Sequence, residues 1–145
     1  MVVAVAKLIA LLVAHLSLTV HVATTPTRAS TSGCLFLIKN RVVEGGRQTT
    51  CLRTVDGVPY PGSVVKSRGT MAFTLEHGTI AARVLSVLRF GHDGVHAAQR
   101  VTGTVTGGSG AYRGVRGSLS ARGTVVDRRA RIGRVSVAYT FVLKR

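Results

Sequence analysis

The chain has 145 residues, of which 46% are hydrophobic and none is Trp, and its formal net charge is +15. This length excludes a second domain, because removal of a leader would leave about 115 residues, close to the commonest domain size. The positive excess attracts polyanions such as nucleic acid, anionic lipid head groups, or the phosphate and carboxylate polymers of a cell envelope.

The N-terminus has the layout of a secretory signal peptide. Lys7 precedes the apolar run Leu8–Val22, and the polar stretch Thr24–Ser32 follows it. An apolar run of about fifteen residues is shorter than the roughly twenty of a permanent transmembrane helix. We expect a helical signal peptide that is cleaved after Ala29. Cleavage after Ala23 and an uncleaved membrane anchor are the alternatives.

Removal of residues 1–29 would leave a single domain, residues 30–145, outside the cytoplasm. This domain would be secreted or associated with the cell envelope. Losing Lys7 and Arg28 with the signal leaves 18 basic against five acidic residues, a net charge of +13. The mature protein would therefore remain strongly basic.

Two cysteines, Cys34 and Cys51, follow the expected signal, and a pair in an oxidising compartment is expected to form a disulfide. A simple hairpin closed by residues 44–47 would place Cys51 opposite Asn40 and leave Cys34 about six residues away. Bridged cysteines need Cα atoms within about 7 Å. Either the pair is reduced, or a bulge or a longer excursion brings the two together.

From residue 33 onward, apolar and polar residues alternate with a period of two, which is typical of half-buried antiparallel strands. The alternation is clearest in Met71–Leu75, Ile80–Phe90, Val101–Val105, Leu119–Val125 and Val135–Leu143. Turn dipeptides separate these segments, and we interpret His77-Gly78 as a two-residue hairpin loop. Regular spacing and long strands predict an all-β protein with an antiparallel eight-stranded β-barrel, with a β-sandwich as the alternative.

A glycine-rich segment lies between two of these expected strands. Its residues are Gly107, Gly108, Ser109, Gly110, Tyr112, Arg113, Gly114, Arg116 and Gly117. The glycines allow a sharp turn through positive φ, Tyr112 could plug the end of a barrel, and Arg113 or Arg116 could pair with a carboxylate.

This segment resembles the signature of the dirigent and allene oxide cyclase-like barrel superfamily, and the chain looks like its exported bacterial members. The resemblance is best from Ala97 to Val126, with Ser109 where Thr is usual. It implies an eight-stranded antiparallel barrel with an apolar cavity, often a trimer. Plant members steer phenoxy radical coupling or cyclise a fatty-acid epoxide. Neither activity is transferred, because none of the five acidic residues can be placed in a cavity from its motif context.

We assign no catalytic, cofactor-binding or metal-binding residue. The glycines around Ser109 lack the ending of a P-loop and the context of a nucleophile elbow. His92 and His96 flank a turn and do not share a helix face, so solvated loop histidines are favoured over a zinc site.

The densest positive patch contains Arg128, Arg129, Arg131 and Arg134. It lacks interleaved aromatic residues that could stack bases, and export also argues against a nucleic-acid partner. An anionic envelope polymer is a more suitable partner. A solvated hairpin tip explains the same residues.

The leading functional hypothesis is a secreted barrel that binds a small apolar or aromatic ligand in its lumen, as the resemblance implies, without a recognisable catalytic motif. One alternative is an envelope-associated basic protein that binds anionic polymers. Another is a cyclase or isomerase, which requires an ionisable residue facing a cavity. We do not assign an enzymatic activity from the sequence.

Overall fold

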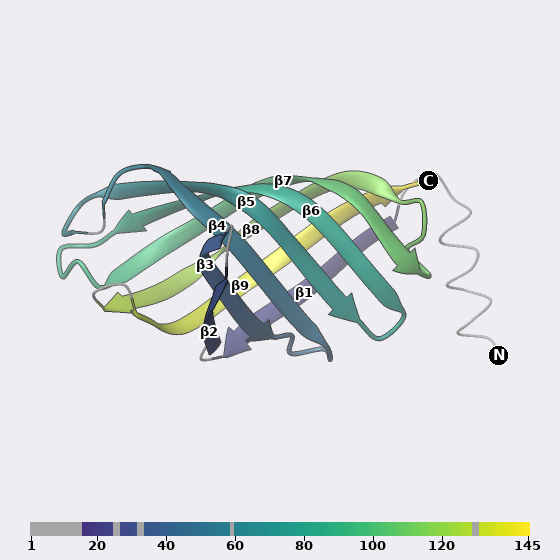
Figure 1. Ribbon diagram of the computed structural model, residues 1–145, viewed down its shortest axis with the longest axis horizontal. Helices are drawn as coiled ribbons and strands as arrows, with labels where there is room; N and C mark the ends of the chain where they lie inside the picture. Colours follow the sequence, from purple (N-terminus) through teal and green to yellow (C-terminus); the bar gives the residue numbers. More distant parts are fainter. Residues whose placement is uncertain (1–15, 25–26, 32–33, 59, 129–130) are drawn as a thin grey trace.

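The computed structural model describes residues 16–24, 27–31, 34–58, 60–128 and 131–145, with the backbone alone described at 24, 27–31, 35–37, 128 and 131–132. All regular structure in these ranges is β (Figure 1). The strands are β1 (Leu16–Thr24), β2 (Thr27–Thr31), β3 (Cys34–Arg41), β4 (Arg47–Asp56), β5 (Val64–Leu75), β6 (Gly78–Phe90), β7 (His96–Gly110), β8 (Arg116–Arg128) and β9 (Arg131–Lys144).

These strands form one antiparallel sheet in the order β1-β9-β8-β7-β6-β5-β4-β3-β2. Consecutive strands from β2 to β9 are neighbours, and β1 lies at the far edge beside β9. The sheet curls into a barrel (Figure 1) whose wall consists of eight strands, β1 and β3–β9. The predicted antiparallel eight-stranded barrel is therefore confirmed, and the sandwich alternative is not adopted.

The barrel closes where β1 meets the end of β3. Val22 forms an antiparallel bridge with Val42, and the Val43 backbone N–H donates to the His21 carbonyl at 2.8 Å. The same edge of β3 pairs with the short strand β2, because β4 occupies its other edge. The contact of β1 with the end of β3 covers part of the β1 edge, which would otherwise be open to pairing with other chains, and leaves β2 as an edge strand.

Inward-facing side chains follow the predicted period of two. On β9, every second residue from Val135 to Leu143 is buried, and the same holds for Met71 and Phe73 on β5. The Phe73 ring packs edge-on against Tyr139 and Phe141, with centroid distances of 5.1 and 4.9 Å. Edge-to-face pairs add about 0.5–1.5 kcal/mol each beyond the area that they bury.

Two local predictions differ from the structure. The β5–β6 loop is Glu76-His77, and Gly78 is already the first residue of β6, paired with Leu75. In the β3–β4 hairpin, Gln48 faces Asn40, not Val43. A loop of five residues, 42–46, produces this register, because Val42 is used for the bridge to β1.

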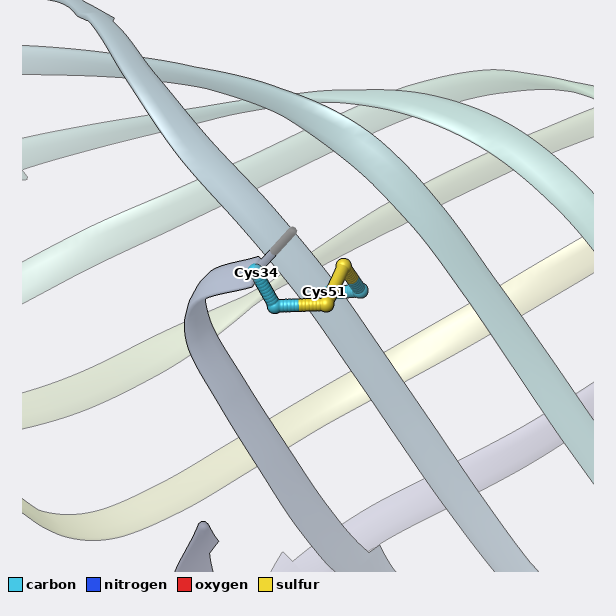
Figure 2. Close-up of a disulfide and its surroundings, with 2 residues drawn as sticks. All are labelled: Cys34 and Cys51. Carbon is cyan, nitrogen blue, oxygen red and sulfur yellow. A yellow bond between two sulfur atoms is a disulfide. The ribbon is translucent and has the colours of Figure 1, made fainter. Parts of the chain in front are cut away.

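Cys34 and Cys51 form a disulfide with a Cα separation of 5.3 Å. In the β3–β4 ladder Cys51 faces Leu37, so a straight strand would hold Cys34 three positions away. The regular pairing ends at Phe36, and the chain before it curves back over β4 (Figure 2). Of the two alternatives, the structure therefore contains the disulfide and not a reduced pair of cysteines. An irregular start of β3 brings the two cysteines together.

Strand β1 lies inside the segment that the sequence assigned to a signal peptide. Its nine residues pair one to one with β9, from Leu16 opposite Leu143 to Thr24 opposite Val135. Val20 and Val22 are buried in the main core. Residues 1–15, which include the start of the apolar run, lie outside the described residues. No described residue belongs to a helix that could cross a bilayer.

Cleavage after Ala29 stays a prediction, and it would remove β1 together with the first residues of β2. A chain beginning at Ser30 should therefore be less stable than one beginning at Leu16, because it lacks the β9 partner and the buried Val20 and Val22, worth about 1.5–3 kcal/mol each. Chemical denaturation and light scattering of both chains would measure the loss and any association through the open β9 edge. Equal stability would show that another segment covers β9.

Glu44 reinforces the seam between β1 and the β3–β4 loop. Its carboxylate accepts from the His21 backbone N–H at 2.8 and 3.0 Å and contacts His21 Nδ1 at 2.5 Å. Slight burial raises the pKa of Glu44, but the hydrogen bonds from His21 outweigh it and hold the pKa below its usual value. Stabilisation of this kind is present above the usual carboxyl pKa and is lost as the pH falls through the lowered value.

Replacement of Glu44 tests this contact. Glu44→Gln should lower the free energy of unfolding by about 1 kcal/mol at neutral pH, a value reduced for the exposure of the pair. The difference should shrink as the pH falls below about 4. Denaturant titrations at several pH values, with the exposed Asp56→Asn variant as a charge-matched control, would measure it. An equal effect of both substitutions would contradict a role in the seam.

Candidate functional site

One part of the barrel lumen is hollow. Fifteen residues of seven strands, β3–β9, line the cavity: Ile38, Asn40, Thr50, Leu52, Thr54, Val65, Ser67, Met71, Ser86, Leu88, Gln99, Val125, Asp127, Val135 and Tyr139. Many of them lie near the end of β4, β6 or β8, or near the start of the following strand. The cavity therefore lies toward the end of the barrel that carries the β4–β5, β6–β7 and β8–β9 connections.

The opposite end of the lumen is filled by large side chains. Phe73, Phe141, Ile80 and Leu143 are almost completely buried there. Tyr112 is also buried and belongs to the same core cluster. Because this end is packed, the cavity has a closed floor.

The space is large enough for a small organic molecule. The cavity has a volume of about 110 Å³. An engineered apolar cavity of about 150 Å³ is enough to bind benzene. The lumen is thus not packed solid with side chains.

Buried polar side chains line the part of the cavity formed by β3 and β4. Asn40 Nδ2 donates to Gln48 Oε1 at 2.7 Å, and Gln48 Nε2 donates to the Thr50 hydroxyl. Asn40 is 8% exposed, and its Oδ1 has no hydrogen-bond partner among the described residues. A buried acceptor without a donor is costly, by about 1–3 kcal/mol.

A second polar group lies on β5–β7. Gln99 Nε2 donates to the Ser86 hydroxyl at 2.9 Å, and Ser86 is paired across the sheet with Ser67. Both serines are buried. These small side chains occupy inward positions that a large apolar residue would fill, which leaves room in the lumen.

Two ionisable side chains face the same cavity, Asp127 of β8 and Tyr139 of β9. Tyr139 is 2% exposed, and burial strongly raises the pKa of its hydroxyl. Strand β8 continues through Arg128, and the side chain of Asp127 lines the lumen. A cyclase or isomerase would require an ionisable residue that faces a cavity, and the sequence motifs did not identify one. In the structure, Asp127 occupies such a position.

The glycine-rich segment contains the predicted turn through positive φ, at residues 111–115 between β7 and β8, but its first residues belong to β7 and its last to β8. β7 continues through Gly110, with a bulge at Thr106 where Ala81 faces Gly107 and Ala82 faces Val105. Gly108 is packed so closely that a Cβ there would lie 2.9 Å from the Tyr112 Cβ. Gly110 has a φ of +61°, which begins the turn into Tyr112. The segment thus holds Tyr112 in the packed end, away from the cavity.

The arginines of this segment lie at the surface. Arg116 donates to the Val115 carbonyl at 2.9 Å, and the Arg113 carbonyl accepts from Arg145 Nε at 3.3 Å. Ser109 contacts the Thr79 hydroxyl across the β6–β7 pair at 2.6 Å. No residue of the glycine-rich segment lines the cavity.

The structure describes only part of the basic patch that was predicted at the β8–β9 turn. Arg129 and the side chains of Arg128 and Arg131 lie outside the described residues. Arg134 is exposed on β9. The outward arginines of β4–β8 form a larger basic surface that the sequence analysis did not identify.

The loop histidines have separate surroundings. Asp93 accepts hydrogen bonds from the backbone N–H groups of Val95 and His96, and these bonds, with the His96 ring contact, lower its pKa well below the usual value. His92 is exposed. In the described part of the chain, no three metal-ligating side chains gather.

Sequence reasoning missed the polar cavity residues Asn40, Thr50, Ser67, Ser86 and Gln99. A signal was present, because each lies in phase with buried apolar residues of its own strand. Ser86, for example, stands between Val84 and Leu88 in the alternation of β6. Polar residues at inward-facing strand positions indicate an interior that contains water or a cavity.

No family model and no curated protein matches this chain. The solved structures that are similar to it include two of dirigent proteins, the family that the glycine-rich segment resembles. The pterocarpan synthase dirigent protein GePTS1 is 13% identical, with a TM-score of 0.35, 90% of this chain and 85% of that chain covered. For the pterocarpan synthase dirigent protein PsPTS1 the identity is 13%, the TM-score 0.38 and the coverage 90% and 95%. With TM-scores this low, the likeness assigns neither a family nor an activity to the chain.

Proposed function

We propose that this protein binds, outside the cytoplasm, a small apolar or aromatic molecule that carries a hydrogen-bond donor, and that the binding site is the cavity in the barrel lumen. The observation that carries the proposal is the hollow half of an otherwise packed lumen, with the buried and unpartnered Asn40 Oδ1 at its wall. The disulfide between Cys34 and Cys51 supports a location outside the cytoplasm, because disulfides persist in oxidising environments.

The walls favour an apolar ligand body. Leu52, Val65, Met71, Leu88 and Val135 line the cavity between its polar groups. Pockets of this kind bind by burying apolar surface, at about 25 cal/mol per Å², while a few polar groups fix the orientation. The acceptor on Asn40 would select for a ligand with a hydroxyl or N–H group.

Displacement of a neutral dye such as Nile red tests this site. We expect 2-naphthol to displace the dye at a lower concentration than naphthalene, because only the naphthol can donate to Asn40 Oδ1. Asn40→Leu should remove most of that difference, about tenfold for a hydrogen bond worth roughly 1.4 kcal/mol.

Two further variants separate the lumen from the surface. Leu88→Trp should fill the cavity and reduce binding of the dye and of both competitors. Ser120→Trp, on the outer face of β8, adds the same side chain and should leave binding unchanged. Loss of binding in both variants, or in neither, would place the dye outside the lumen and sink the proposal.

Asp127 favours a second candidate function, proton transfer to and from the bound ligand. A carboxylate facing an enclosed cavity can take a proton from one carbon of a ligand and return it to another, which isomerises the ligand without a co-reactant. Tyr139 in the same cavity remains protonated at neutral pH and can donate a hydrogen bond to a developing oxyanion.

This candidate predicts that a ligand found by displacement is converted by the protein and that Asp127→Asn still binds it. The rate of conversion, followed by NMR, should fall at least a hundredfold in that variant. Asp93→Asn, a loop carboxylate outside the cavity, serves as the control. Conversion at an unchanged rate in Asp127→Asn would eliminate the acid–base role.

A further inference from the structure

Arginines that are far apart in the sequence lie together on one outer face of the barrel. Among the described residues of β4–β8, eight outward-facing arginines are exposed. Arg47 and Arg116, the first residues of β4 and β8, are left out, and we refer to the other six as the arginine wall: Arg53, Arg68, Arg83, Arg89, Arg100 and Arg122. None of these guanidinium groups makes a hydrogen bond or an ion pair within the described part of the chain.

The sheet register places these arginines next to one another. Arg53 lies directly opposite Arg68, and Arg100 directly opposite Arg122. Arg68 and Arg83 are diagonal neighbours, since Arg68 faces Leu85, and together they line a shallow surface groove over Gly103. Like charges directly opposite in a sheet repel, so the fold maintains the wall at a cost in stability.

The acidic residues are held away from this surface. Glu44, Glu76 and Asp93 lie in loops, Asp56 ends β4, and Asp127 faces the lumen. Glu44 and Asp93 are also bound to His21 and His96. The protein therefore has no carboxylate of its own between the arginines of β5–β8, and an external anion is the available partner.

We propose that the arginine wall is a binding site for a linear anionic polymer, independent of the lumen. The five strands β4–β8 span about 20 Å at the normal strand spacing, so one small anion contacts one or two arginines while a polymer can contact most of them. Arginine is suited to phosphate and carboxylate groups alike, because its planar fork donates two parallel hydrogen bonds to either.

The chemistry of the wall favours a polymer over a membrane or a nucleic acid. Among the described residues the exposed large hydrophobics are Val43, Val55, Val58, Tyr60 and Val142. Of these only Val55 lies on a wall strand, β4, and a single valine is a small surface to insert into a bilayer. The described aromatic side chains of the wall strands are buried, so no platform exists there for stacking bases. Charge alone, spread along a surface, matches a phosphate- or carboxylate-bearing glycan or a similar polymer.

Calorimetry of the full chain with long-chain polyphosphate and with alginate tests the proposal and distinguishes phosphate from carboxylate. We expect binding of at least one polymer that weakens steeply with salt, as counterion release requires. Inorganic phosphate at the same phosphate concentration should not compete. Absence of binding to both polymers, or equal competition by inorganic phosphate, would overturn the proposal.

Two triple variants that lose the same number of charges distinguish binding by the arginine wall from binding by the net charge of the protein. Arg68→Gln, Arg83→Gln and Arg100→Gln together should weaken binding at least tenfold and lower its salt dependence. A control variant with Lys39→Gln, Arg113→Gln and Lys144→Gln loses the same number of charges outside β4–β8 and should bind nearly as the parent does. Equal weakening in both variants would mean that net charge, and not the wall, is responsible.

Two additional measurements make the outcome independent of folding and of the lumen. Because the wall variant removes like-charge repulsion, its melting temperature should be equal to or above that of the parent. Nile red displacement should be unchanged in it, so failure of polymer binding and failure of lumen binding are separate results. Tighter binding to anionic lipid vesicles or to duplex DNA than to both polymers would also reject the proposal.

Discussion

The barrel has an interior because β1 joins β9 along its whole length and meets β3 at the bridge between Val22 and Val42. The consecutive hairpins from β3 to β9 make a curved sheet, but a curved sheet alone leaves one face open to water. With β1 in place, the two edges come together, and Val22 is completely buried. Both the packed core and the hollow cavity depend on this closure.

Within the closed wall, the size of every second side chain decides what is filled and what is empty. Phe73 packs edge to face against Tyr139 and Phe141 and helps to fill the packed end of the lumen. Toward the β4–β5 end the inward positions carry the neighbouring residues Ser67 and Ser86, whose side chains are too short to fill the lumen. The cavity is therefore a consequence of small and polar residues at positions where the strand pattern requires burial.

The same alternation separates two kinds of chemistry. The inward face provides an acceptor on Asn40 and a carboxylate on Asp127, in surroundings that favour an apolar molecule with a polar group. The outward face of β5–β8 presents arginines with no carboxylate between them. Because adjacent residues of a strand point to opposite sides of the wall, a neutral ligand inside and an anionic polymer outside would not compete for the same residues.

Much of the fold could be predicted from the sequence. The period of two in Ile80–Phe90 and Val135–Leu143, with turn residues between the strands, determines an antiparallel sheet with one buried face, because alternation and turns are local properties of the chain. The glycine-rich segment and its turn through positive φ were recognised, although β7 extends through Gly110 and the turn itself is confined to residues 111–115. Its role at the packed end depends on Tyr112 meeting the rest of the core.

The tertiary structure alone decided the remaining features. The apolar run at the N-terminus is equally suited to a signal peptide and to a strand, and pairing with β9 is what makes Leu16–Thr24 part of the wall. The disulfide required a bend at the start of β3 that no local pattern encodes. The cavity and the arginine wall arise from residues far apart in sequence that the register brings together. The sequence by itself determines which residues face in or out, and the long-range pairing of strands determines which of them become neighbours.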